Sequence, residues 1–253
     1  NAPFSASSPV VDILLSDAAR TVVNRHSGGT LSQVPSQFMG TTAPTFAAIL
    51  TLKEAARFTG MSAEAIAAAD AELRALPVTD ADRAARCVRF DNDVPRLSPT
   101  GGNPRVLVFE KINGVKDVPS VNAAHAALEA MAARKGWSIA FTDKGGAINA
   151  RTLRGFDTVV WNNISGDVLT LSQRSALQRF LERGGGFAAI HGSAGDPVYF
   201  WDWYADSLIG ARFAGHPMAP QFQEARVVVN TAHPLASKAA LPAEWRMTDE
   251  WYS

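Results

Sequence analysis

The chain has 253 residues, of which 47% are hydrophobic and 19% are charged, a composition typical of a globular protein rather than a disordered or coiled-coil one. Lys and Arg total 24, as do Asp and Glu, so no basic face for binding nucleic acid is expected. No apolar run reaches the roughly 20 residues that a membrane-spanning helix needs.

The first residues bear on the location of the protein. The chain begins at Asn1 rather than Met, and residues 1–5 are typical of a mature N-terminus left after signal-peptide cleavage. We therefore expect a periplasmic or secreted protein, with a cytoplasmic location as the alternative.

Residues 1–78 are predicted to form a small all-α module. Apolar residues in 10–22 recur at the three- and four-residue spacing of one helix face, and the Gly28-Gly29 pair ends this helix. A second apolar-periodic stretch covers 46–58, and Ser62 can cap a third helix.

Two pieces of this module carry a loose resemblance, SPVVDILLSDAARTVVNRH and TGMSAEAIAAADAELRALP. They resemble the small helical modules attached to secreted bacterial esterases and glycoside hydrolases. An ordinary packing module of three helices is the alternative, and neither interpretation assigns chemistry to this segment.

Residues 79–104 are predicted to be a linker. They combine mixed charges with Pro95, Pro99 and a turn cluster at 100–104. Cys87 lies here and is the one cysteine of the chain, so it can form neither an intramolecular disulfide nor a cysteine-rich metal site. We expect it to be a partly buried structural residue, because no glycine-rich turn surrounds it.

From Arg105 the pattern changes to that of an α/β domain, predicted for residues 105–253. Short apolar runs alternate with helical segments, which predicts βαβ units, right-handed crossovers and a mostly parallel sheet. Ligands of such sheets bind beyond the carboxyl ends of the strands. The expected strands are 106–109, 137–141, 158–161 and 187–190, with helices capped by Ser120 and Ser172 between them.

Polar and aromatic side chains gather in the loops that leave these strand ends. His191 directly follows the fourth strand, among small residues that permit a tight turn. Aromatic rings follow within a dozen residues, and rings beside carboxylates and amides suit stacking on sugars and hydrogen bonding to hydroxyl groups. The other residues singled out in these loops are Lys111, Asn162, Asn163, Ser193, Asp196, Trp201, Trp203 and Tyr204.

Four segments stand in the order and spacing of ThuA-like (trehalose utilisation) domains. They are RVLVFEKINGVKD, FDTVVWNNISGDVLT, FLERGGGFAAIHGSAGDPVYFWDWYADSLIGARFAGHP and RMTDEWYS. Residues 105–253 thus resemble this family, which implies the flavodoxin-like sheet of class I glutamine amidotransferases and a role in carbohydrate metabolism. A Cys occupies the strand-end turn of those amidotransferases, where this chain has His191, so the resemblance implies no glutaminase activity.

The chain departs from the family pattern in two places. Many relatives carry a His in the first loop, in a Gly-Phe-Arg-His-like run, where this chain has Gly-Val-Lys-Asp at 114–117. The family domain also continues beyond its Asp-Glu-Trp-Tyr motif, so the resemblance implies a further C-terminal portion after Ser253. ThuA-like domains also occur as parts of larger multidomain proteins, and a homo-oligomer is compatible with the sequence.

We expect an enzyme, a hydrolase or an isomerase, that acts on a sugar, a disaccharide or an oxidised sugar. His191 is the predicted general acid/base, because imidazole titrates nearest to neutral pH. Asp196 and Glu250 are the other predicted catalytic residues. The predicted substrate-binding residues are Lys111, Asn162, Asn163, Ser193, Trp201, Trp203, Tyr204 and Trp251.

Three alternatives remain open. His191, His216 and Glu250 could ligate zinc or another divalent metal, in a site assembled across loops because no HExxH spacing is present. Ser193 could be a hydrolase nucleophile, although His-Gly-Ser-Ala-Gly lacks the first glycine of that motif. The chain could also be a non-catalytic sugar-binding or interaction module. His125, on a predicted helix, is expected to be solvated or structural.

Overall fold

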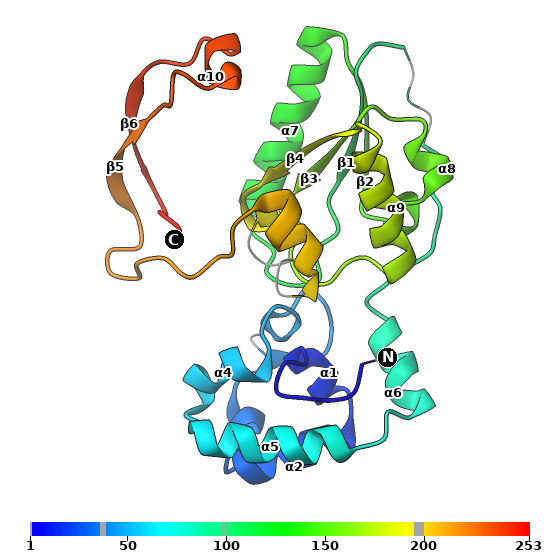
Figure 1. The fold of residues 1–253 in the computed structure, drawn as a ribbon, viewed down its shortest axis with the longest axis vertical. Coiled ribbons are helices and arrows are strands. Elements are labelled where there is room, and N and C mark those ends of the chain that lie inside the picture. The colour runs from blue at the N-terminus through cyan, green and yellow to red at the C-terminus, as the bar shows by residue number, and fades with distance from the viewer. Residues whose placement is uncertain (1, 36–38, 98, 100, 195–199) are drawn as a thin grey trace. The chain divides into compact units, whose positions relative to one another are not determined.

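The computed structural model describes residues 2–35, 39–97, 99, 101–194 and 200–253 (Figure 1). The chain divides into two compact units, Asn1–Ala211 and Arg212–Ser253. The first unit contains an N-terminal helical region followed by a parallel sheet flanked by helices, as expected for an α/β protein of this pattern.

The helical region contains more breaks than the sequence predicted. The single helix expected over 10–22 is two helices, α1 (Val10–Leu14) and α2 (Asp17–His26). Ser16 separates them because its hydroxyl accepts a hydrogen bond from the Ala19 amide and so caps α2. The other elements of this region are η1 (Thr30–Gln33), η2 (Phe46–Ala48), α4 (Leu52–Thr59) and α5 (Ala63–Ala75).

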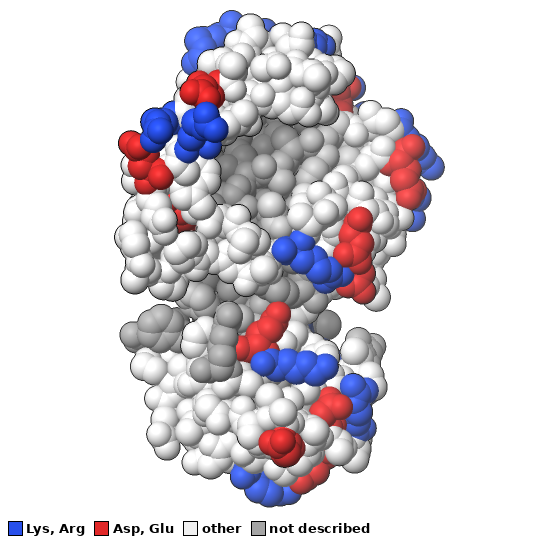
Figure 2. All heavy atoms as spheres, turned by 60° about the vertical axis from the view of Figure 1, so that its left-hand side comes forward, with Lys and Arg blue, Asp and Glu red and all other residues white. Residues whose placement is uncertain are grey.

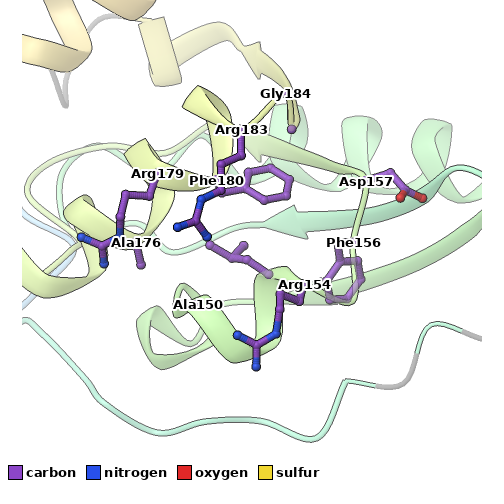
Figure 3. A pocket seen from close by; sticks show the side chains of 11 residues that line it. Ala150, Arg154, Phe156, Asp157, Ala176, Arg179, Phe180, Arg183 and Gly184 are labelled. Atoms are coloured by element: carbon purple, nitrogen blue, oxygen red, sulfur yellow. The ribbon is translucent and has the colours of Figure 1, made fainter.

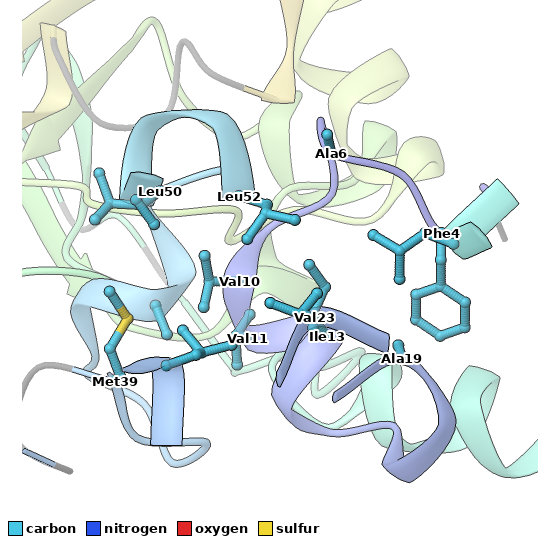
Figure 4. Close-up of a cluster of buried hydrophobic side chains, with 14 of the residues drawn as sticks. Phe4, Ala6, Val10, Val11, Ile13, Ala19, Val23, Met39, Leu50 and Leu52 are labelled. Carbon is cyan, nitrogen blue, oxygen red and sulfur yellow. The ribbon is translucent and has the colours of Figure 1, made fainter. Parts of the chain in front are cut away.

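These helices enclose an apolar core of their own (Figure 4). Phe4, Val10, Ile13 and Leu52 are completely buried in it. Burial of one side chain of this size stabilises the folded state by about 1.5–3 kcal/mol relative to leaving it exposed. These four residues therefore contribute substantially to the stability of the helical region.

The segment 79–104 is not entirely a linker, because its first third forms α6 (Asp80–Cys87). Thr79 and Asp82 form a capping box at its start, a signal that the sequence carried and our prediction did not use. Cys87 ends this helix and is exposed, rather than partly buried as expected.

A buried cluster of charges ties α6 to α1. The carboxylate of Asp12 lies 2.5 Å from Nη1 of Arg89 and 3.6 Å from Nε of Arg86. All three side chains are at most 12% exposed. Arg86 also donates to the backbone oxygen of Ala2 and lies over the ring of Phe4. Charges buried to this degree are stable only when they are paired.

The sheet has four parallel strands in the order β2-β1-β3-β4. They are β1 (Arg105–Phe109), β2 (Ser138–Thr142), β3 (Thr158–Asn162) and β4 (Gly186–Ile190), within one residue of the expected bounds. This confirms the predicted α/β fold.

Helices cover both faces of the sheet, and the alternation of side chains assigns them (Figure 1). Val106 and Val108 pack on the side of α7 (Val118–Lys135). Leu107 and Phe109 point to the other face and share a core with α8 (Ala150–Leu153) and α9 (Leu171–Glu182). The caps of α7 and α9 are Asp117 and Thr170, not the predicted Ser120 and Ser172.

The second unit is a small antiparallel ribbon. β5 (Gln223–Val228) pairs with β6 (Glu244–Asp249), and the short α10 (Pro234–Lys238) lies between them in the sequence. Every residue of β6 is exposed.

On the face in Figure 2, basic and acidic side chains are interspersed rather than gathered by sign. Within the described ranges, none of the helices combines the length and the apolar character needed to cross a membrane.

One exposed ion pair at the start of β1 offers a pH test. Hydrogen bonds from the Arg105 guanidinium, at 2.7 and 3.1 Å, and from its backbone amide lower the pKa of Asp157 to about 2. Because the folded-state pKa is depressed, the stability that this carboxylate contributes is present above about pH 4 and is lost as the pH falls toward 2. An NMR titration should show this pKa, and Arg105→Gln should return it toward the ordinary value. An unchanged pKa in that variant would contradict the pairing.

Candidate functional site

Two tight turns lie side by side at the carboxyl ends of β3 and β4. Asn163 follows β3 with a φ of 55°, and His191 follows β4 with a φ of 51°. Among the described residues, Ala240 is the one other non-glycine residue with positive φ. Such backbone conformations cost of order 1 kcal/mol or more and concentrate at functional sites. The sharp turn expected after Ile190 is therefore present, and His191 is exposed on it.

A chain of side-chain hydrogen bonds leads from His191 across the end of the sheet. Nδ1 of His191 lies 2.9 Å from Oδ1 of Asn163. Nδ2 of Asn163 donates to Oδ1 of Asn162 at 2.8 Å, and Nδ2 of Asn162 donates to Oε1 of Glu110 at 2.8 Å. Glu110 in turn lies 3.0 Å from Nδ1 of His125. Groups from the ends of β1, β3 and β4 and from α7 thus form one connected network.

The order of donors and acceptors in this network determines which nitrogen of His191 carries the proton. The carboxylate of Glu110 can only accept, so Asn162 must present its amino group to it and its oxygen to Asn163. Asn163 then donates through its own amino group and presents its oxygen to His191. The Nδ1 of His191 is consequently the donor, and in the neutral ring the lone pair lies on Nε2.

The buried positions of the two asparagines keep this arrangement rigid. Asn162 is completely buried and Asn163 is 3% exposed. Asn162 also donates to the backbone oxygen of Val121, and Asn163 accepts from the hydroxyl of Ser120. Rather than facing solvent as groups for binding sugar hydroxyls, both lie behind His191 and orient it.

The far end of the network is partly open. The side chain of Glu110 is 15% exposed and that of His125 is 40% exposed. The ring of His125 stacks on Phe141 of β2, with centroids 3.8 Å apart. His125 is therefore a member of the network rather than an isolated solvated residue.

Ser193 and Tyr204 support the turn after β4 from inside the core. Both are completely buried. The hydroxyl of Ser193 donates to the backbone oxygen of Trp161 and accepts from the amide of Ile164, while Tyr204 donates to the backbone oxygen of Ser193. Burial raises the pKa of Tyr204 well above its ordinary value. This placement differs from the substrate-binding role expected for both, and it leaves the Ser193 hydroxyl engaged rather than poised as a nucleophile.

The tryptophans that follow the turn form a half-buried aromatic group. The ring of Trp201 lies 5.3 Å from Trp203 and 5.7 Å from Tyr204, and the Arg174 guanidinium lies 5.5 Å from the centre of the Trp201 ring. Trp203 is the first residue of η6 (Trp203–Ile209), which is a π-helix. Short π-helical segments are frequent at functional sites. Trp201 and Trp203 are both partly exposed.

Lys111 is engaged elsewhere. Its ammonium group pairs with Asp91, in the segment between α6 and β1. Burial raises the pKa of Asp91, whereas hydrogen bonds from Lys111 and from the backbone amides of Gly146 and Gly145 lower it. Together the hydrogen bonds outweigh burial, so the pKa lies below its ordinary value. Lys111 thus holds the 91–93 segment against the domain, a structural role instead of the expected contact with substrate.

The remaining predicted residues of the described chain belong to the second unit. Glu250 accepts from Gln221 and, at 2.5 Å, from the hydroxyl of Tyr252. The ring of His216 lies edge-on to Tyr252, and Trp251 donates to the backbone oxygen of Gln223. Asp196 lies outside the described residues.

The metal alternative remains a hypothesis. His191 belongs to the first unit, and His216 and Glu250 belong to the second. Among the residues that the structure describes, no three His, Cys, Asp or Glu side chains lie close enough together to hold a metal ion.

Glu110, His125 and Ser120 were missed by the sequence analysis as site residues. Glu110 directly follows an apolar strand, so the rule that selected His191 could also have selected it. His125 and Ser120 carried no comparable signal, because they lie on α7. Which side of this helix faces the ends of the strands depends on how the helix packs on the sheet.

Comparisons with known proteins bear on this domain. The family model described as ThuA, trehalose utilisation, matches residues 105–253, more than half of the chain. A crystal structure described as that of a candidate ThuA-like protein from Bacteroides uniformis ATCC 8492 is 21% identical, with a TM-score of 0.49. The similarity covers 63% of this chain and 64% of that protein, less than two thirds of its length. No curated protein matches the sequence. By the match of the family model, the chain belongs to the ThuA (trehalose utilisation) family through its residues 105–253.

Proposed function

We propose that the protein is a carbohydrate-active enzyme, a hydrolase or an isomerase, in which His191 transfers a proton at the carboxyl end of the sheet. One observation carries the proposal. His191 is exposed on a strained turn, and its Nδ1 is held by the buried Asn163. An imidazole held in one tautomer and one orientation is a suitable general base.

The proton would move at Nε2. In the neutral ring this nitrogen takes a proton from a sugar hydroxyl, from a carbon next to a carbonyl, or from a water molecule, and the resulting imidazolium returns it. Asn163 accepts from Nδ1–H in both forms, so the ring does not have to reorient during the cycle. The carbohydrate class follows from the description of the family, and the half-buried Trp201 and Trp203 offer rings on which a sugar could stack.

A turnover assay on the full protein tests the proposal. Trehalose, other disaccharides and oxidised sugars are incubated with the protein, and products are identified by NMR or mass spectrometry. We expect turnover of at least one sugar and its reduction by about 100-fold or more in His191→Ala, since general acid–base catalysis typically contributes 10²–10⁴-fold. His26→Gln, which alters a histidine in the helical region paired with Glu72, serves as the control and should retain turnover.

Two results would count against this assignment. Turnover that survives in His191→Ala, with the variant folded by circular dichroism, would remove His191 from the mechanism. Saturable glycan binding by the wild type with no product from any sugar would instead favour a non-catalytic sugar-binding module.

A further inference from the structure

A cavity lies at the end of the sheet opposite to His191, where β3 and β4 begin (Figure 3). It has a volume of about 340 Å³ and lies between α8 and α9. Asp157 lines it just before β3, and Gly184 and Gly185 line it just before β4. His191 leaves the opposite end of β4, so this cavity is separate from the site described above.

The floor of the cavity is apolar. Leu153, Phe156 and Ala176 are buried there, at 2%, 4% and 6% exposure. The ring of Phe180 completes it and lies directly against Gly185, where a Cβ atom would come within 2.3 Å of the ring. Glycine at this position therefore allows the aromatic side chain to line the cavity.

Three exposed arginines surround this floor. Arg154 follows α8, Arg179 lies in the last turn of α9 and Arg183 follows that helix. Figure 3 shows Arg183 extended over the hollow, with Arg179 and Arg154 at its edges. The three arginines thus come from the ends of two different helices and line one cavity.

The charges of these arginines are not balanced within the described residues. The ion pairs of the first unit include Arg20, Arg25, Arg74, Arg83, Arg86, Arg89, Arg105 and Arg174, but none of these three. The one acidic residue of the lining, Asp157, is already paired with Arg105. Arg183, the C-cap of α9, also lies four residues after Arg179, and like charges at this spacing on a helix repel by a few tenths of a kcal/mol.

All three arginines lie at the carboxyl end of a helix, Arg154 at that of α8 and Arg179 and Arg183 at that of α9. Basic residues interact favourably with such an end. That interaction does not require the two helix ends to lie beside one apolar hollow, as they do here. An anionic ligand would account for all three, because guanidinium groups bind carboxylate and phosphate oxygens through paired hydrogen bonds.

We propose that this cavity binds a small organic anion, a carboxylate or phosphate ester whose apolar body lies on the floor. The anionic group would lie among Arg154, Arg179 and Arg183, and an aromatic or aliphatic body would contact Phe156 and Phe180. The volume falls at the lower end of the range for small-molecule sites, which suits a ligand of one ring or a short chain.

Phenyl phosphate is a probe that carries both parts, and its binding can be measured by calorimetry or by NMR of the backbone amides. We expect saturable binding with a Kd of about 1 mM or tighter. Phenol lacks the charge and inorganic phosphate lacks the ring, so each should bind at least about fivefold more weakly. Shifted amide signals should map to α8, α9 and Gly184–Gly185, and added salt should weaken binding.

Substitution of the arginines separates this site from nonspecific attraction. Arg154→Ala, Arg179→Ala and Arg183→Ala should each weaken binding by about fivefold or more, since each removes a charged hydrogen-bond donor. Arg151→Ala is the matched control, because Arg151 is exposed on α8 outside the lining of the cavity. The proposal is wrong if phenyl phosphate does not bind saturably, if phenol or phosphate binds as tightly, or if Arg151→Ala has the same effect. None of these outcomes depends on His191.

Discussion

Asp12→Ala is expected to lower the free energy of unfolding by about 3–5 kcal/mol, the range found when one partner of a buried ion pair is removed. The loss arises because Arg86 and Arg89 stay buried and lose the carboxylate with which both form an ion pair. Nε and Nη2 of Arg86 and Nε of Arg89 already have no hydrogen-bond partner among the described residues, so removal of the carboxylate adds to groups that are already unsatisfied. Denaturant unfolding followed by circular dichroism measures the change.

An exposed carboxylate in the next helix provides the control. Asp17 pairs with Arg20 at 2.6 Å, but its side chain is 93% exposed. Asp17→Ala should therefore change the free energy of unfolding by no more than about 1 kcal/mol. Equal losses in the two variants would show that the Asp12 cluster does not tie α6 to α1 in the way its geometry indicates.

Asn163→Gly is expected to reduce the turnover of any sugar substrate by about 10- to 100-fold. Without the Asn163 oxygen, the imidazole of His191 is no longer held in one tautomer and one orientation. This prediction rests on the proposed function of His191. Glycine accepts the positive φ of this position, so the turn itself should be preserved while the acceptor for Nδ1 is removed.

The ring of His191 also provides a readout that needs no substrate. Its ¹⁵N chemical shifts should show a proton on Nδ1 in the wild type and a loss of that preference in Asn163→Gly. Glu110→Gln should weaken the preference as well, since a glutamine amide can both donate and accept and no longer dictates the direction of the two asparagines. Wild-type His191 with its proton on Nε2 would contradict the network, whereas a correct tautomer without turnover would contradict only the proposed function.

Much of the α/β domain could be predicted because its signals are local. A short apolar run such as Val106–Phe109 indicates a strand buried on both faces, and a glycine such as Gly136 marks a helix end within one residue. The position of His191 could be predicted for the same reason, since it follows its strand directly and parallel strands present their carboxyl ends at one edge.

The partners of His191 could not be predicted in this way. Glu110 and Asn162 are 52 residues apart, and Asn163 and His191 are 28 apart, so their contact depends on the strand order and register. Ser193 and Tyr204 show the opposite case. Their residue types suit a sugar site, but Ser193, in the turn after β4, and Tyr204, in η6, are both buried in the core, where their hydroxyl groups bond to backbone atoms.

The sequence by itself determined the alternation of strands and helices, the family of residues 105–253 and the turn that presents His191, because each of these depends on residues adjacent in the chain. The tertiary structure alone decided the hydrogen-bond partner of His191, the contacts of Lys111 and Tyr204, and the placement of Arg154, Arg179 and Arg183 around one cavity. The physical reason is that hydrogen-bond direction, burial and charge compensation depend on which side chains lie close together in space. In a sheet, the register in which the strands pair determines these contacts between residues that are distant in the sequence.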